Sequence, residues 1–203
     1  MSRVRYTVGI DLGQSFDYTA FAVLEERRLR QYDLRHVERH RDVPYPAIVE
    51  RTRELVSKLE GHVSLAVDAT GVGRPVVDML EDANLGADLY ALTLTGGDNV
   101  RREGRHVWVP KRDVVSSVAC LLQTARLRIP RNLPGAEVLE RELVRFRAKI
   151  SISGHDTYEA WREADHDDLV LAVALACWLN EKGRDGWSLY IQEALDKQEE
   201  ERR

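Results

Sequence analysis

The sequence predicts a single α/β domain built on a mixed β-sheet. Its 203 residues, 43% of them hydrophobic and 32% charged, are enough for one domain with a sizeable core. Strand-like segments come first without helices between them, and helix-like and strand-like segments then alternate. This order predicts antiparallel strands that are extended by parallel strands through right-handed crossovers.

Three strands open the predicted fold. Residues 5–11 and 18–25 are apolar or alternating runs on either side of the turn-rich segment GQSFD, which predicts a hairpin. Residues 28–38 alternate between apolar and charged side chains, as a strand with one solvated face does. We therefore expect a three-stranded antiparallel meander.

Helices and strands alternate in the next part of the chain. Residues 44–60 show helical spacing of apolar side chains after two prolines, and Gly61 follows as a C-terminal cap would. The run VSLAVDA at 63–69 predicts a buried strand, TGVGRPVVDML at 70–80 a turn and helix, and LYALTL at 89–94 another strand. We expect both strands to extend the sheet in parallel.

The second half is mainly helical by pattern. Residues 112–126 and the segment around Leu139 and Leu143 are amphipathic, and residues 166–179 are apolar nearly all round, as in a helix packed deep against a sheet. Residues 149–161 alternate about a glycine and predict a small β-hairpin. We expect residues 1–183 to form the domain and 184–203 to form a charged surface helix or tail.

Composition excludes several protein classes. No apolar run is long enough to cross a bilayer, and the N-terminus lacks a signal-peptide core, so we expect a cytoplasmic protein without membrane contact. Cys120 and Cys177 lie in apolar helical segments, which predicts small core residues rather than a disulfide or a zinc site.

Positive charge is concentrated in one segment of an acidic chain. Residues 101–149 hold 12 Lys and Arg against 5 Asp and Glu, a local net charge of +7, whereas the whole chain carries −4. Because phosphate attraction depends on the local field, this segment permits a polyanion partner. A solvated basic face is the alternative.

Aspartates occupy positions where a charged residue is unexpected. Asp11 ends the first apolar strand, Asp68 ends the buried strand VSLAVD, and Asp167 and Asp168 open the most apolar helix. A single aspartate at such positions also serves as a turn former or helix cap. The carboxyl ends of parallel strands, however, meet at one sheet edge, where open α/β proteins bind ligands.

Carboxylates that converge at such an edge repel one another unless cations lie between them. Their hard oxygen donors, with few histidines and no thiolates nearby, favour Mg²⁺ or Mn²⁺ over zinc. The sequence therefore predicts a magnesium or manganese site.

Several of these segments together resemble a known family. VGIDLGQSFDYTAFAV, LAVDATGVGRPVVDML, KRDVV, LRIP and DHDDLVLAVALA are similar to the nuclease domain of the large terminase subunit of tailed phages. The resemblance covers most of residues 5–180. It implies a ribonuclease H-like fold and cleavage of duplex DNA by two metal ions during genome packaging. It names a packaging ATPase domain, the small terminase subunit and the portal as candidate partners.

The resemblance also assigns residues. It implies Asp11, Asp68 and Asp168 as the main metal ligands, with Asp167 beside them, and Asp17 as support behind the ligands. His166 lacks partners at metal-ligand spacing and is expected to start the helix or to support the ligands.

The sequence departs from full-length large terminases in one respect. It contains no GxxxxGK[ST] phosphate loop, so we do not expect it to be the ATPase motor. It is interpreted as the nuclease part alone, either as a portion of such a protein or as a stand-alone nuclease.

Rival functions remain open at this level. GIDLG also resembles the phosphate-binding hairpin of actin-like and sugar-kinase ATPases, but those enzymes need a longer chain and do not explain the paired aspartates. A Holliday-junction resolvase would share the fold and the metal chemistry. A non-catalytic DNA-binding module would keep the aspartates only as turns and caps.

Duplex DNA is expected to contact the basic segment. The glycine-rich run TGGDNVRREGR follows a strand that ends near the acids, and its arginines suit phosphate contacts without base reading. The expected contacts are Arg101, Arg102, Arg105, Lys111 and Arg112. The alternative track is Arg126, Arg128, Arg145 and Lys149.

Overall fold

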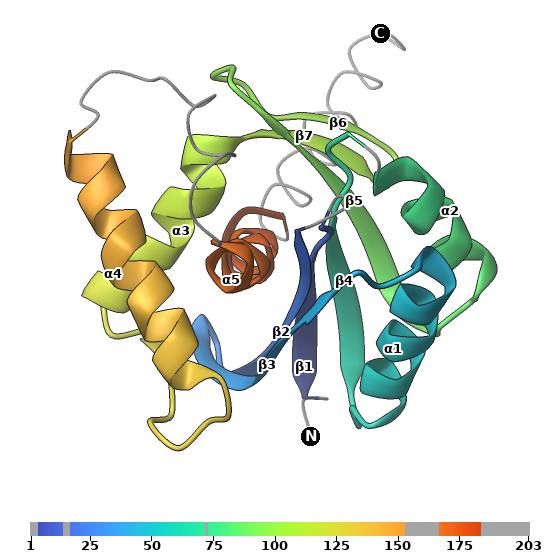
Figure 1. The fold of residues 1–203 in the computed structure, drawn as a ribbon, viewed down its shortest axis with the longest axis horizontal. Helices are drawn as coiled ribbons and strands as arrows, with labels where there is room; N and C mark the ends of the chain where they lie inside the picture. The colour runs from blue at the N-terminus through green and yellow to red at the C-terminus, as the bar shows by residue number, and fades with distance from the viewer. Residues whose placement is uncertain (1–3, 14–16, 72, 153–166, 184–203) are drawn as a thin grey trace, which may run out of the picture.

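A central eight-stranded sheet is covered by helices on both faces (Figure 1). This computed structural model describes residues 4–13, 17–71, 73–152 and 167–183. The strand order is β6-β7-β5-β4-β1-β2-β3-β8, which places β1 and β4 near the middle. The predicted mixed α/β sheet is confirmed.

The three N-terminal strands form the predicted meander. β1 (Arg5–Asp11), β2 (Tyr18–Arg28) and β3 (Gln31–Arg41) pair antiparallel in sequence order. The inner parts of all three strands are buried because helices cover both faces of the sheet there.

The later strands join β1 in parallel, as expected. β4 (His62–Asp68) pairs with β1, β5 (Asp88–Thr95) pairs with β4, and β7 (His106–Pro110) pairs with β5. The edge strands are short: β6 (Arg101–Glu103) runs antiparallel to β7, and β8 (Leu127–Arg128) runs parallel to β3.

Some expectations about local structure are wrong. The glycine-rich run after β5 was expected as one loop, but its residues 101–103 form β6. Residues 149–152, expected as the first hairpin strand, continue helix α4 (Ala136–Ile152), and the rest of that predicted hairpin lies outside the described residues. Cys120 is exposed on helix α3 (Lys111–Gln123), whereas Cys177 is buried as predicted. The predicted tail at 184–203 also lies outside the described part.

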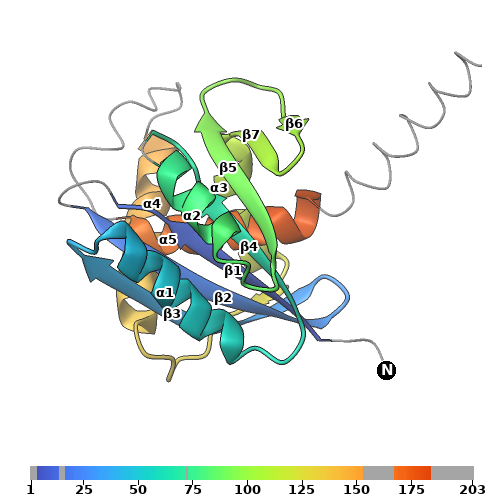
Figure 2. The same cartoon turned by 90° about the vertical axis from the view of Figure 1, so that its right-hand side faces the viewer.

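Helices α1 (Tyr45–Ser57) and α2 (Gly73–Asp82) lie on one face of the sheet (Figure 2). Ile48 and Leu55 of α1 and Val76 of α2 are buried in a core with the apolar side chains of β1 and β4. This core holds the two central strands from one side.

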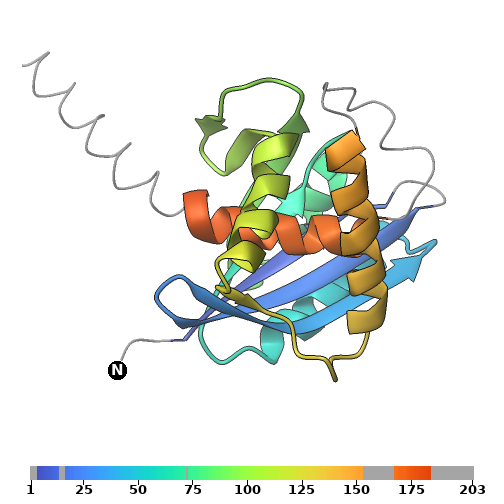
Figure 3. The same cartoon turned by 90° about the vertical axis from the view of Figure 1, so that its left-hand side faces the viewer.

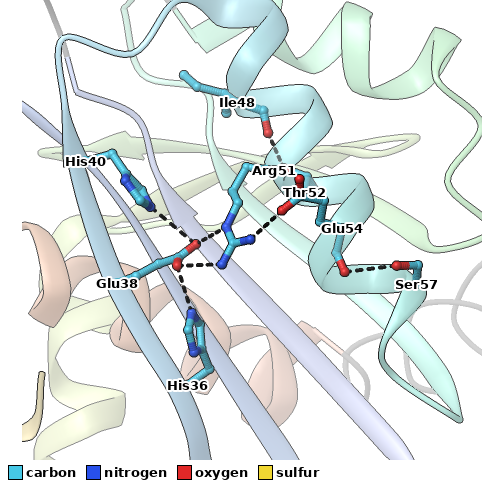
Figure 4. Close-up of polar contacts among 8 residues, drawn as sticks. All are labelled: His36, Glu38, His40, Ile48, Arg51, Thr52, Glu54 and Ser57. Carbon is cyan, nitrogen blue, oxygen red and sulfur yellow. Dashed lines mark hydrogen bonds and ion pairs between the residues drawn. The ribbon is translucent and has the colours of Figure 1, made fainter. Parts of the chain in front are cut away.

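An ionic cluster ties α1 to β3 (Figure 4). Arg51 donates to both carboxylate oxygens of Glu38 at 2.7 Å, and His36 Nε2 and His40 Nε2 lie 3.0 and 3.5 Å from that carboxylate. Burial alone would raise the pKa of Glu38, but its contacts with His36 and Arg51 outweigh burial and hold that pKa far below its usual value. Glu38 is therefore an anion that attaches the helix to the sheet.

The opposite face carries α3 (Lys111–Gln123), α4 (Ala136–Ile152) and α5 (Asp168–Trp178), which is followed by a π-helical turn at Leu179–Gly183. Helix α5 contacts β1 and β2 on its inner side and α3 and α4 on its outer side (Figure 3). It is buried all round, as the sequence predicts. No helix in the described ranges is long and apolar enough to cross a membrane.

Close packing at Gly9 fixes the position of α5 on the sheet. A Cβ atom on Gly9 would lie 1.9 Å from the backbone oxygen of Ala172 and 3.2 Å from Cβ of Ala176. Only glycine at this position of β1 allows the helix backbone to come so near. The small side chains of Ala172 and Ala176 complete the contact.

We expect Gly9→Ala to lower the free energy of unfolding by about 1–3 kcal/mol or more, because the added methyl overlaps a helix backbone that cannot easily shift. Chemical denaturation followed by circular dichroism measures the change. Gly96→Ala is the control, since a Cβ there meets nothing within 4 Å and should change stability by less than about 0.5 kcal/mol. Equal stability of both variants would contradict the close contact.

Candidate active site

Two aspartates end adjacent parallel strands at the same sheet edge. Ile10 of β1 is in register with Val67 of β4, so Asp11 and Asp68 follow directly on neighbouring strands. Strands in a sheet lie about 4.8 Å apart. Asp11 is buried, with 8% of its surface exposed, and Asp68 is partly buried. The predicted convergence of these two acids is present in the fold.

Asp68 also shapes the turn that follows it. Its Oδ1 accepts a hydrogen bond from the Thr70 amide at 2.7 Å, and Thr70 Oγ1 accepts one from the Leu94 amide at 2.9 Å. A Cβ on Gly73 would lie 2.5 Å from the Asp68 carbonyl oxygen, so glycine lets α2 start beside this strand end. Asp68 thus forms a turn and still lies beside Asp11, at the end of the sheet that we call the acidic edge.

Helix α5 brings the second pair of aspartates. Asp167 is in the N-cap position and Asp168 in the first turn, and both are buried, with 7% and 9% of their surface exposed. The Asp167 side chain makes no capping hydrogen bond. Side-chain capping, the alternative interpretation of this pair, does not account for Asp167.

The electrostatics of Asp11 show which groups share the site. Burial raises the pKa of Asp11 well above its ordinary value of 3.8, and Asp68 and Asp168 raise it further. Lys111 acts in the opposite direction, and Asp17, exposed just before β2, adds a small increase. The charged groups that act on Asp11 therefore come from the end of β4, the position before β2 and the N-termini of α3 and α5. His166 lies outside the described residues.

The donor set suits a hard divalent cation. Within the described ranges, no three His, Cys, Asp or Glu side chains lie close enough as placed to hold a metal ion. The acids around Asp11 nevertheless offer only carboxylate oxygens, and their mutual repulsion is what a cation would relieve. The residues fit Mg²⁺ or Mn²⁺ in chemistry, and binding would require their side chains to draw together.

Sequence comparison finds relatives among the large terminase subunits of phages. The chain is 26% identical over 188 residues to the large terminase subunits of Thermus phage G20c and Thermus virus P23-45. The matched region is 93% of this chain and 34% of each relative. The chain thus spans about a third of the length of these proteins. No protein-family model matches it.

Solved structures agree on the fold. The large terminase nuclease of thermophilic phage G20c superposes with a TM-score of 0.56 at 20% identity, covering 85% of this chain and 81% of that one. The same nuclease solved with bound zinc gives a TM-score of 0.54 at 22% identity, covering 85% and 80%.

The resemblance to large terminases is confirmed. The chain shares its fold with the large terminase nuclease solved from phage G20c, as the resemblance implied.

The basic residues expected to contact DNA from the charge pattern fall into two groups in the structure. Lys111 and Arg112 begin α3 at the acidic edge, and Arg112 pairs with Asp98 of the preceding loop at 2.7 Å. The other three lie on β6 or on the turn after it, which runs back from that edge. Arg101 stacks on Trp108 with 4.7 Å to the ring centroid, and Arg105 pairs with Glu81 at 2.6 Å.

Sequence reasoning missed two residues beside Asp168. Glu142 of α4 is 4% exposed, and Arg39 of β3 lies 2.9 Å from Glu142 Oε1 and 3.9 Å from Asp168 Oδ2. Burial raises the pKa of Glu142 to about 7, and Asp168 adds to this, while the Val170 amide and Arg39 oppose it. Neither residue had a sequence signal, because each looks like one more charge on an amphipathic element.

We expect Asp11→Asn to stabilise the metal-free protein at neutral pH. Because the folded protein holds the pKa of Asp11 above its unfolded value, ionisation of Asp11 costs stability at any pH above the folded pKa. The gain from Asn should shrink as the pH falls and vanish below about 3.8, where Asp11 is protonated in both states. Denaturant titrations in chelator across pH 3–8 measure this difference.

The control is Asp78→Asn, which removes an exposed carboxylate from α2 and should have little effect at any pH. A wild-type protein that is more stable than Asp11→Asn at neutral pH would contradict the electrostatic description of the site.

Proposed function

We propose that this chain is a metal-dependent endonuclease that cuts double-stranded DNA during phage genome packaging. The observation that carries the proposal is that Asp68 and Asp168, from two other elements, act electrostatically on the buried Asp11. Buried acids that repel one another destabilise a fold, and such groups are found mainly where they bind a ligand or take part in a reaction. The similarity to large terminase subunits supports this choice among ribonuclease H-like activities.

The proposed metal ligands are Asp11, Asp68 and Asp168, with Asp167 beside them. Two bound Mg²⁺ or Mn²⁺ ions would supply an activated water and neutralise charge on the phosphate being cut. Asp11, which Asp68 and Asp168 influence from two other elements, would contribute to both ions. The Lys111 ammonium offsets part of the negative charge at Asp11 and offers a contact for an incoming phosphate. Asp17 would support the ligands from the start of β2.

Wider assembly is part of the same proposal. The relatives are large terminase subunits about three times as long as the matched region. We infer that this nuclease works with a packaging ATPase domain, a small terminase subunit and a portal. These partners would deliver duplex DNA to the acidic edge.

Plasmid cleavage should fall by at least about a thousandfold, with the protein still folded, in each of three single variants: Asp11→Asn, Asp68→Asn and Asp168→Asn. Each removes a ligand charge and preserves side-chain volume. Gel analysis of supercoiled plasmid in Mg²⁺ or Mn²⁺ measures the rate, and a four-way junction of the same length tests the resolvase alternative. Cleavage confined to the junction would favour that alternative.

Asp88→Asn is the matched control, because Asp88 begins β5 at the opposite edge of the sheet and is exposed. It should cut at the wild-type rate. In wild type, chelator should abolish cutting, Mn²⁺ or Mg²⁺ should restore it, and Ca²⁺ should not, because its looser coordination aligns water and phosphate poorly. Near wild-type cutting by the three aspartate variants, or cutting in chelator, would overturn the proposal.

The basic segment should carry the duplex. We expect Lys111→Ala with Arg112→Ala to weaken binding and to lower the slope of log affinity against log salt by up to about 2, since each lost phosphate contact lowers it by about 0.9. A triple variant, with Arg101, Arg102 and Arg105 all changed to Ala, tests whether the DNA contacts continue along β6 and the turn after it. Fluorescence anisotropy with a labelled duplex in Ca²⁺ measures both.

Arg53→Ala is the control for DNA binding, because Arg53 is exposed on α1, belongs to neither candidate track and pairs with Glu50 at 3.2 Å. If both basic variants kept the wild-type salt slope, the DNA track would have to lie elsewhere, with Arg126, Arg128, Arg145 and Lys149 as the next candidates.

A further inference from the structure

The N-terminus of α5 is capped by another helix. Glu142 Oε2 accepts hydrogen bonds from the Leu169 amide at 3.0 Å and from the Val170 amide at 3.3 Å. These are the second and third residues of α5, whose amides an N-cap side chain usually binds. Asp167 occupies the N-cap position, but its side chain makes no such bond. A glutamate on α4 therefore caps the helix in place of Asp167.

The other carboxylate oxygen of Glu142 holds the Arg39 guanidinium next to Asp168. Arg39 Nη1 donates to Glu142 Oε1 at 2.9 Å and lies 3.9 Å from Asp168 Oδ2. The Arg39 guanidinium also stacks on the Tyr18 ring, with 4.4 Å to its centroid. Elements α4, β3 and β2 are thereby connected to the first turn of α5.

We propose that Glu142 is a positioning residue for the active site, which caps α5 from α4 and so directs Asp167 and Asp168 toward the metal ions. This inference rests on the proposed function. A cap provided by Asp167 itself would turn one of the two carboxylates toward the helix amides. With Glu142 on those amides, the first turn of α5 is fixed without using either aspartate for the purpose.

Two conservative variants separate capping from charge balance. Glu142→Gln keeps the length of the side chain and an acceptor oxygen, and the partly exposed Arg39 can turn away from the new amide group. Glu142→Asp keeps the charge but is one methylene shorter, so its oxygens fall short of the Leu169 and Val170 amides. If Glu142 acts as a cap, the Glu142→Gln variant should resemble wild type more than the Glu142→Asp variant does. If Glu142 serves only to balance charge, the Glu142→Asp variant should resemble wild type more.

Hydrogen exchange of the backbone amides gives a readout that needs no metal. In the full chain, Leu169 and Val170 should exchange at least about tenfold faster in Glu142→Asp than in wild type, and within about threefold of wild type in Glu142→Gln. The amide of Ala174, deeper in α5, should be unchanged in both. Glu140→Ala, which removes an exposed glutamate from the same helix, is the control.

Calorimetric titration with Mn²⁺ alone gives the second readout. Loss of a group that orients metal ligands commonly lowers metal affinity by 10- to 100-fold. We expect a loss of about that size in Glu142→Asp and a clearly smaller one in Glu142→Gln. The positioning role is wrong if Glu142→Asp keeps amide protection and Mn²⁺ affinity at least as well as Glu142→Gln does. It is also wrong if both variants behave as wild type. If wild type itself bound no Mn²⁺, the proposed function would fail, while the exchange rates would still decide whether Glu142 caps α5.

Discussion

The contact between Gly9 and Ala172 determines where the acids can meet. From that contact, Asp11 lies two residues further along β1, about 6.6 Å away, and Asp168 lies one helical turn back along α5, about 6 Å away. Strand and helix thus carry their carboxylates to the same end of the sheet over similar distances. A wider separation between β1 and α5 would leave the acid of the helix out of reach of the acid of the strand.

Negative charge at the site is balanced from its margins. Arg39 lies on one side near Asp168, and Lys111 lies on another near Asp11. Burial and the neighbouring acids together raise the pKa of Asp11 by more than Lys111 lowers it. The fold therefore keeps an unfavourable charge arrangement in the free protein, and the hydrophobic packing of α5 and the ionic link between Glu38 and Arg51 compensate for it elsewhere.

Strand-end and helix-start signals made part of the site predictable. Asp11 and Asp68 end apolar strands, so local pattern and parallel topology were enough to predict that these two lie side by side. Asp168 stands out because it opens an apolar helix, but its assignment to the same site came from the terminase resemblance. Glu142 and Arg39 act through contacts between elements distant in sequence, which periodicity does not encode. Strand β6 was missed because its three residues, Arg-Arg-Glu, carry no apolar signal and form a strand only by pairing with β7.

Chain order has a consequence for the timing of activity. Asp11 and Asp68 lie in the first half of the sequence, but helix α5 with Asp168 follows nearly all the other described elements. A chain still emerging from the ribosome can form the meander and β4 long before α5 is available to cover β1. Any reaction that needs all of these acids must therefore wait until α5 has been synthesised and has packed on β1.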